Sequence, residues 1–140
     1  MNYEEFLERH RASKHFAQDI GVDLISISDG HAVAELPVTE RLFNPIGTIH
    51  GGVMYTLADT VCGCAAVSRG QISTTIEGKL NHIRATTEKD KKLIAKADVL
   101  HFGRQTIVTS VEIQNDSGRT VAAGLFTYFV LDEKTVNYRI

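Results

Sequence analysis

An apolar stretch of helix length, residues 53–67, constrains the fold of this chain more than any other segment. It reads VMYTLADTVCGCAAV and contains one acid, Asp59. A helix that is apolar on nearly every side has to be covered over most of its surface. A helix over about 51–68 would be roughly 27 Å long, and strands of about eight or nine residues reach a similar length. We therefore expect an α+β fold in which a curved antiparallel β-sheet wraps a long central α-helix.

The rest of the chain supplies strands for such a sheet. Residues 31–38 and 105–114 alternate between apolar and polar side chains, which is typical of half-buried antiparallel strands. The turn sequence Asn-Asp-Ser-Gly at 115–118 joins the second of these segments to a strand over 119–131. That last strand is apolar on both faces, so one face can cover the helix and a subunit interface should cover the other.

The predicted order of elements is a short helix at about residues 3–16, two strands, the long helix and then four strands. No linker, repeat or low-complexity segment divides residues 1–140, and we expect a single domain. Fifteen basic against seventeen acidic residues argue against a nucleic-acid binder that relies on bulk charge. No segment reaches the length of a membrane span, and the N-terminus lacks the apolar core of a signal peptide, so we expect a cytoplasmic protein.

Cysteines and histidines give no sign of a metal site. Cys62 and Cys64 are expected to be small, buried core residues. Five of the histidines lack the spacing of metal ligands and are expected on the surface or in loops. They are His10, His15, His31, His82 and His101.

Asp59 and the segment before the helix are the candidates for chemistry. Burying a carboxylate in an apolar helix costs several kcal/mol of lost hydration, so an acid kept there is a functional candidate. If the helix begins near His50, its first backbone N–H groups have no partner inside the helix and can hold a developing oxyanion. Gly51 and Gly52 carry no side chain that would block a substrate carbonyl.

Each of these residues also has a structural interpretation. Asp59 could bond a buried Ser, Thr or backbone group, and His50 could be a satisfied residue at a helix start. Asn44 could simply shape the turn that it forms with Pro45.

The pattern Asn44-x-x-Gly47-x-x-His50-Gly51-Gly52, followed by Leu57-Ala58-Asp59, resembles the hotdog-fold acyl-CoA thioesterases of the PaaI-like (phenylacetyl-CoA thioesterase) branch. The resemblance runs from about residue 21 to residue 131. It implies a hotdog fold, dimers that usually pair into tetramers, and coenzyme A as part of the substrate with no other cofactor. It also implies that Thr75 bonds the nucleophilic water.

Thioester hydrolysis needs a polarised carbonyl and either an activated water or an attacking carboxylate. The Gly51 N–H would polarise the carbonyl, with Asn44, His50 and Gly52 helping to place the thioester. Asp59 would act as general base or as nucleophile, and the sequence leaves both roles open.

The phosphates of coenzyme A predict a basic rim. Arg84, Lys89, Lys91, Lys92 and Arg104 could supply it, although residues 89–92 could equally be a solvated hairpin. Gly103-Arg104 matches the Gly-Lys/Arg turn of the family, so Arg104 is the preferred phosphate contact. The acyl pocket is expected to include Met54, Tyr55 and Leu57, together with strand residues of a neighbouring subunit.

His50 and Asp59 are nine residues apart on one predicted helix, roughly 13 Å, too far to act on one thioester bond. Two antiparallel helices across a two-fold axis would bring His50, Gly51 and Asn44 of one subunit beside Asp59 and Thr75 of the other. We expect aryl, arylacetyl or medium-chain acyl-CoA as substrate. A hotdog hydratase or dehydratase and a non-enzymatic acyl-CoA-binding module are the alternatives.

Overall fold

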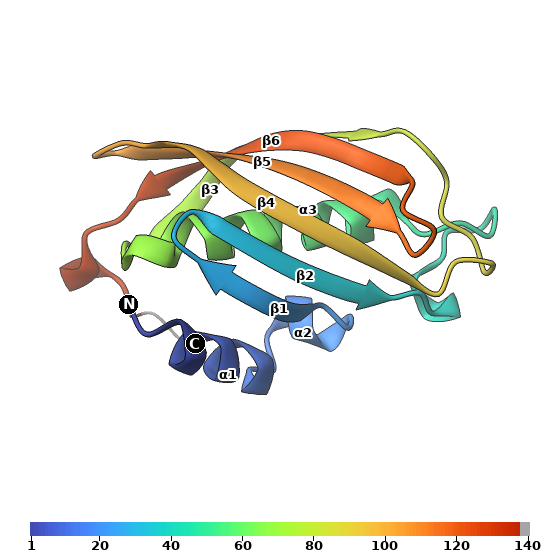
Figure 1. The fold of residues 1–140 in the computed structure, drawn as a ribbon, viewed down its shortest axis with the longest axis horizontal. Helices are drawn as coiled ribbons and strands as arrows, with labels where there is room; N and C mark the ends of the chain where they lie inside the picture. Colours follow the sequence, from blue (N-terminus) through green and yellow to red (C-terminus); the bar gives the residue numbers. More distant parts are fainter. Residues whose placement is uncertain (138–140) are drawn as a thin grey trace.

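In a computed structural model that describes residues 1–137, six strands form one antiparallel sheet that wraps a long helix (Figure 1). The strand order across the sheet is β1-β2-β4-β5-β6-β3, which leaves β1 and β3 at the edges. The strands are β1 (Asp23–Ser28), β2 (His31–Pro37), β3 (Ser73–His82), β4 (Lys92–Phe102), β5 (Thr106–Asn115) and β6 (Thr120–Val130). The helices are α1 (Tyr3–Ala12), α2 (Phe16–Asp19) and α3 (Gly51–Ala66), with short 3-10 turns at Glu40–Leu42, Val67–Arg69 and Glu133–Thr135. This is the hotdog arrangement that the sequence predicted.

The long helix α3 begins and ends where local chemistry allows. The ring of His50 accepts a hydrogen bond from the Gly52 N–H and caps the first turn. At the other end the α-helix tightens into the 3-10 turn Val67–Arg69, and Gly70 ends it with φ +92°. The predicted end at residue 68 therefore falls within the 3-10 turn.

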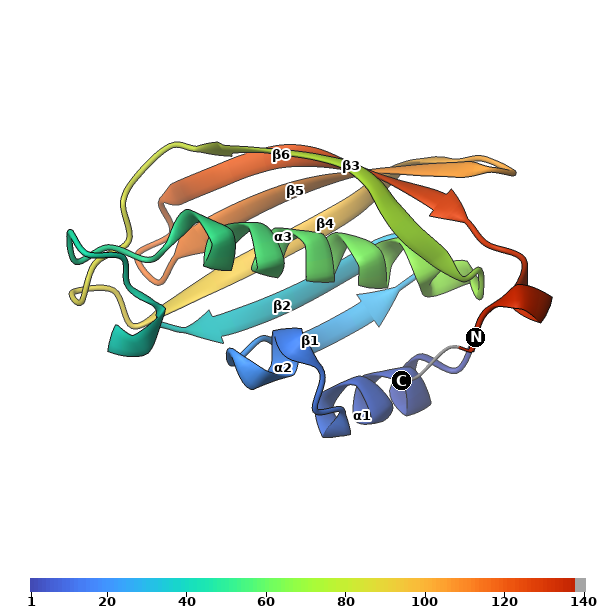
Figure 2. The ribbon, with the colours of Figure 1, turned by 180° about the vertical axis from the view of Figure 1, so that it is seen from behind.

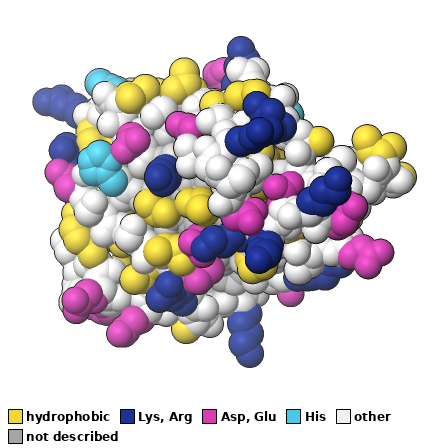
Figure 3. Space-filling model, turned by 45° about the vertical axis from the view of Figure 1, so that its right-hand side comes forward, with side chains coloured by type: hydrophobic (Ala, Val, Ile, Leu, Met, Phe, Trp, Pro, Cys, Tyr) yellow, Lys and Arg dark blue, Asp and Glu magenta, His cyan; other side chains and the backbone are white. Residues whose placement is uncertain are grey.

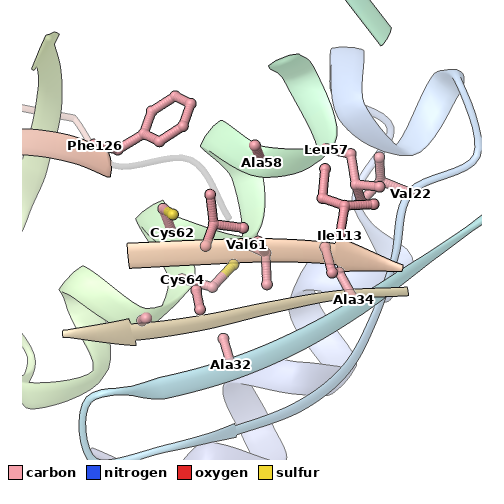
Figure 4. Packing of buried hydrophobic residues seen from close by; sticks show 14 of the residues in the cluster. Val22, Ala32, Ala34, Leu57, Ala58, Val61, Cys62, Cys64, Ile113 and Phe126 are labelled. Atoms are coloured by element: carbon pink, nitrogen blue, oxygen red, sulfur yellow. The ribbon is translucent and has the colours of Figure 1, made fainter. Parts of the chain in front are cut away.

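The core lies between α3 and the concave face of the sheet. Leu57, Ala58 and Val61 of the helix are fully buried against inward-facing strand residues such as Ala34 and Ile113 (Figure 4). The alternation predicted for β2 and β5 is confirmed, since Ala32, Ala34, Leu36, Ile107, Thr109, Val111 and Ile113 are all buried.

Cys62 and Cys64 are core residues, as predicted. Burial raises the pKa of each thiol to about 12, so both remain protonated and unreactive near neutral pH.

One face of α3 is not covered by the sheet. Figure 2 shows the helix across the concave side of the sheet with no other element in front of most of its length. Partly or fully exposed positions recur at helical spacing along this face, at Gly52, Thr56, Asp59 and Gly63. These residues, called the open face below, are small or polar.

The N-terminal helix is shorter than predicted. The expected helix over residues 3–16 ends at Ala12, because Ser13 adopts an extended backbone (ψ 149°) and a separate short helix begins at Phe16. His10 was expected near the surface but is buried, with 5% exposure, where α1 packs beside β1. The surface expectation for His10 was therefore wrong; His15, His31, His82 and His101 are exposed.

The convex face of the sheet carries both charged and apolar side chains. Leu125 and Phe129 on β6 are exposed, which agrees with the prediction that one face of this strand needs a cover. On the side drawn in Figure 3, Lys and Arg are interspersed with Asp and Glu, so neither sign of charge dominates that side. Within residues 1–137, no helix is long and apolar enough to cross a membrane.

Candidate active site

Asp59 lies on the open face of α3 and is half-buried. The Thr75 hydroxyl on β3 donates a hydrogen bond to Asp59 Oδ1 at 2.7 Å. The Tyr128 hydroxyl on β6 also donates to Asp59, with its oxygen 2.8 Å from Oδ1 and 2.7 Å from the backbone carbonyl oxygen. Asp59 Oδ2 accepts no hydrogen bond from the residues that the structure describes. One carboxylate oxygen is therefore held in place, and the other is left for a water or a thioester carbon.

The sheet brings these three residues together. Tyr128 pairs with Thr75 across β6 and β3, and both side chains point toward the helix. A register shift between Thr75 and Glu77 interrupts the pairing just after this point.

Tyr128 is a site residue that the sequence did not single out. Burial, followed by the neighbouring Cys62 and Asp59, raises the pKa of its phenol far above the usual value, so the hydroxyl remains a donor at any ordinary pH. The alternation along β6 predicted only that one of the two faces of this strand covers the helix. No sequence signal revealed that its hydroxyl reaches Asp59, because that contact joins segments 69 residues apart.

A pocket of about 250 Å³ opens beside this carboxylate. Asp59, Thr75 and Tyr128 line it, together with Thr60, Gly63 and Cys64 of α3 and Val67 of the following 3-10 turn. Phe6 and His10 of α1 line it as well. We call this cavity the Asp59 pocket.

Of the residues predicted at the start of α3, Gly51 lines a second pocket of about 310 Å³, whereas His50 and Gly52 line neither of the two pockets. Asn44, Gly51 and Arg84 line it together with Met54, His82 and Thr86, and we call it the Gly51 pocket. The backbone N–H of Gly51 donates no hydrogen bond within the described part of the chain, as expected for the first turn of a helix. An unpaired donor thus lies at a pocket wall, next to the positive end of the helix dipole.

His50 and Asn44 both have structural tasks at this end. His50 Nδ1 accepts from the Gly52 N–H at 2.8 Å, so the neutral ring carries its proton on Nε2. Asn44 Oδ1 accepts from the N–H groups of Ile46 and Thr48, and Asn44 Nδ2 donates to the Thr48 hydroxyl at 2.8 Å. The turn-shaping interpretation of Asn44 is therefore fulfilled, and the amide has one further N–H to offer a ligand.

The predicted basic residues do not form one cluster within the chain. Arg84 is exposed at the Gly51 pocket, whereas Arg104 is exposed in the β4–β5 turn at the opposite end of the sheet. The Val130 N–H donates to the carbonyl oxygen of Gln105, and Val130 pairs with Ser73 at the start of β3. The β4–β5 turn therefore lies at the same end of the sheet as Thr75 and Asp59. Lys92 pairs with Glu35 at 3.0 Å and lies on the convex face of the sheet.

Gly103 is required by its turn. A Cβ at this position would lie 2.6 Å from the carbonyl oxygen of Thr106, which accepts the Gly103 N–H at 2.8 Å. Among the residues predicted to line an acyl pocket, Met54 lines the Gly51 pocket. Leu57 is fully buried in the core, and Tyr55 lines neither of the two pockets.

The described residues of one chain therefore hold two half-sites. Gly51 and Asp59 are separated by eight residues of one continuous helix, roughly 12 Å along its axis. The structure brings Asp59 together with Thr75. It brings Gly51 together with Asn44, His50 and Arg84. The two sets lie apart within one chain. Within residues 1–137 no group of three or more His, Cys, Asp or Glu side chains could hold a metal ion.

Comparison with known proteins adds an independent finding. A family model described as the thioesterase superfamily matches residues 46–122. The acyl-coenzyme A thioesterase PaaI of Escherichia coli is 36% identical over 106 residues, which cover 76% of this chain and 75% of that protein.

Solved structures agree with this match. A conserved protein of Pseudomonas aeruginosa is 34% identical with a TM-score of 0.82, and the match covers 88% of this chain and 98% of that one. A thioesterase of Streptococcus pneumoniae that was solved with coenzyme A is 33% identical with a TM-score of 0.75, over 79% of this chain and 86% of that one.

Proposed function

This chain belongs to the thioesterase superfamily and is an acyl-CoA thioesterase, and we propose that it hydrolyses aryl, arylacetyl or medium-chain acyl-CoA with Asp59 as the central group. The observation that carries the proposal is the carboxylate that Thr75 and Tyr128 hold and that lines a pocket, with its second oxygen available. The products are the free acid and coenzyme A, and the reaction uses no further cofactor.

The proposed reaction begins with a water or the carboxylate itself near the thioester carbon. As general base, Asp59 Oδ2 takes a proton from a water that the Thr75 hydroxyl helps to place, and the resulting hydroxide attacks the carbonyl carbon. As nucleophile, Asp59 Oδ2 attacks directly and forms a mixed anhydride, which water then hydrolyses. In either case the carbonyl oxygen gains negative charge, and the thiolate of coenzyme A leaves.

The Gly51 N–H supplies the stabilisation of that charge. It is an unpaired donor at a helix N-terminus, and such a donor stabilises a developing oxyanion more than a ground-state carbonyl. The Asn44 amide and the His50 ring help to place the thioester. Gly52, Arg84, Gly103 and Arg104 are the proposed contacts of the coenzyme A part.

The two half-sites meet when two copies of the chain associate. The open face of α3 carries glycines and threonines beside Asp59, so a second helix can approach it closely. The neighbouring strand β3 has an unpaired edge and an exposed Ile76, which a second copy would cover. Antiparallel pairing of two copies places Gly51, Asn44 and His50 of one beside Asp59 and Thr75 of the other. The exposed Leu125 and Phe129 then support pairing of dimers into tetramers.

Release of free thiol from a panel of acyl-CoAs tests the activity. The panel contains phenylacetyl, benzoyl, hexanoyl and palmitoyl thioesters, and we expect release from the first three. A change in enoyl absorbance without thiol release would instead identify a hydratase. Binding of acyl-CoA with neither signal would identify a non-catalytic acyl-CoA-binding protein.

Isotope labelling separates the two roles of Asp59. In a single turnover with excess enzyme in ¹⁸O-water, a general base delivers the labelled oxygen directly into the product acid. A nucleophilic carboxylate forms a mixed anhydride, and when water attacks its Asp59 carbonyl carbon, the product acid leaves unlabelled in the first turnover and the label appears in Asp59. Label in Asp59 therefore identifies the nucleophile.

Refolding a mixture of two variants tests the shared site. Asp59→Ala and His50→Ala each damage both sites of a homodimer, whereas a mixed dimer has one site with both groups intact. Random pairing should therefore restore about one quarter of wild-type activity. Demonstrated mixed dimers without recovery would show that His50 and Asp59 do not act across the interface.

A further inference from the structure

Helix α1 contributes two rings to the lining of the Asp59 pocket. Phe6 and His10 lie one turn apart on this helix and line the same pocket as Asp59, Thr75 and Tyr128. Both are buried, with 8% and 5% exposure. The pocket beside Asp59 is therefore bounded in part by two buried rings of the N-terminal helix.

The wall formed by α1 is anchored at several points. The Arg11 guanidinium donates to Asp23 Oδ1 and to the Leu24 carbonyl oxygen, both at 2.9 Å, which ties the helix to β1. Gln18 Nε2 donates to the His10 carbonyl oxygen at 3.1 Å. The rings of Phe6 and His10 stack with centroids 6.0 Å apart. Because the helix is bonded at its C-terminal half, its pocket-facing rings form a fixed boundary.

The boundary is uncharged near neutral pH. Burial lowers the pKa of His10, and Asp23 opposes this only in part, so the imidazole is neutral. Phe6, Cys64 and Val67 complete an apolar wall around it.

We infer that Phe6 and His10 of α1 set the length of the acyl group that this enzyme accepts. The inference rests on the proposed function, because hydrolysis puts the thioester carbon beside Asp59 and the acyl group then has to occupy the adjoining cavity. That cavity is about 250 Å³ within one chain, and Phe6 lines it, so a long acyl chain that enters it meets the ring of Phe6.

Replacing Phe6 in both directions tests this boundary. Thiol release is measured for straight-chain acyl-CoAs from hexanoyl to palmitoyl with the wild-type protein and each variant. Phe6→Ala opens the end of the pocket, and we expect the preferred chain to lengthen by about two to four carbons. Each additional buried methylene contributes roughly fourfold, so two give about a 15-fold gain in kcat/KM for the longer chain. Phe6→Trp extends the wall and should shift the preference toward shorter chains.

Leu7→Ala is the matched control. Leu7 lies on the same helix and packs partly against the core, but it does not line the Asp59 pocket. It should loosen α1 and leave the chain-length profile unchanged.

The outcomes separate the inference from the proposed function. If the wild-type protein releases thiol but Phe6→Ala and Phe6→Trp keep its chain-length profile, α1 does not set acyl length and the inference fails. The same holds if Leu7→Ala shifts the profile as far as Phe6→Ala. If the wild-type protein releases thiol from no acyl-CoA, the proposed function itself fails. Thermal unfolding identifies a variant that does not fold, and the opposite substitution at Phe6 then decides.

Discussion

Two regions of α3, called the Asp59 end and the Gly51 end, differ in how their polar groups are hydrogen-bonded. At the Asp59 end, one carboxylate oxygen takes hydrogen bonds from Thr75 and Tyr128, and the surrounding groups are half-buried or buried. At the Gly51 end, a backbone N–H has no partner among the described residues, and His50 is exposed. One end offers a fixed acceptor and the other an unpaired donor. A thioester under attack needs both, so each end by itself is half of a catalytic site.

The two ends also differ in whether a side chain or the backbone takes part in the reaction. At the Asp59 end the reacting group is a side chain, and two other side chains hold it. At the Gly51 end the side chains of His50 and Asn44 shape the turn and cap the helix, and the backbone offers the donor. Substitutions at the Asp59 end should therefore change the reacting group or the side chains that hold it. Substitutions at the Gly51 end should act by changing how closely the substrate approaches the backbone N–H.

The largest expected effect is that of Asp59→Asn. The amide cannot accept a proton or form an anhydride, and general acid–base catalysis alone contributes about 10²–10⁴-fold, so kcat should fall by at least that range. Thiol release with phenylacetyl-CoA measures it, and thermal unfolding checks that the fold is intact. Asp19→Asn, at an exposed position on α2, is the matched control and should be neutral. Near wild-type turnover in Asp59→Asn would falsify the central role of this residue.

Gly51→Ala tests the other end. The new methyl group would lie 3.4 Å from His82 Cε1, and His82 is exposed and able to move aside, so the fold should tolerate it. The methyl group narrows access to the N–H, and loss of an oxyanion donor costs up to ~10³-fold, so we expect about a 10-fold loss of kcat/KM. Alanine is also the better helix residue, which predicts an unchanged or higher melting temperature. Equal activity of variant and wild type would show that substrate does not approach this N–H.

Tyr128→Phe measures what holding the carboxylate contributes. The Tyr128 hydroxyl donates to Asp59 Oδ1, so its loss leaves that carboxylate oxygen held by Thr75 alone. We expect kcat to fall about 10-fold, in line with ~1.5 kcal/mol for a hydrogen bond to a charged group, with little change in KM. An unchanged kcat in a variant that folds would indicate that Tyr128 serves only the packing of the core.

The smallest expected effect is that of Arg104→Ala. A remote phosphate contact stabilises ground and transition states alike, so KM for acyl-CoA should rise about fivefold while kcat stays constant. A pantetheine thioester without the nucleotide should show no change. Arg119→Ala, at the exposed turn between β5 and β6, is the control. If both substrates respond equally, Arg104 does not contact the nucleotide.

Much of the fold could be predicted because its signals are local. The alternation of β2 and β5 and the apolar run of α3 each state which side chains are inside. The end of α1 could not be predicted in this way, because Ser13 is compatible with a helix and leaves it through its own backbone conformation. His10 was misplaced for a related reason: a histidine looks like a surface residue until the helix that carries it is packed against a strand.

In the candidate site, too, only the residues with a local sequence signal could be predicted. Asp59 and Gly51 stand out along the chain, since one is an acid in an apolar helix and the other lies at a glycine-rich helix start. Tyr128 and Phe6 carry no such local sign, and they reach the Asp59 pocket only through strand pairing and helix docking. The meeting of the two half-sites depends on a second chain and stays a prediction.

The register shift in β3 has a consequence for how this site can change. Before the shift Thr75 points inward, and after it Gly78 and Leu80 do, so odd positions face the helix in one half of the strand and even positions in the other. Ile76, which is exposed, is the extra residue at this point. It reverses the alternation of side chains, so that Thr75 faces Asp59 in the first half of β3 while the second half still packs against the core. Removing one residue here would turn Thr75 away from Asp59 although every reacting group remained in the sequence. The geometry of the reaction is thus encoded partly in a residue that touches neither substrate nor carboxylate.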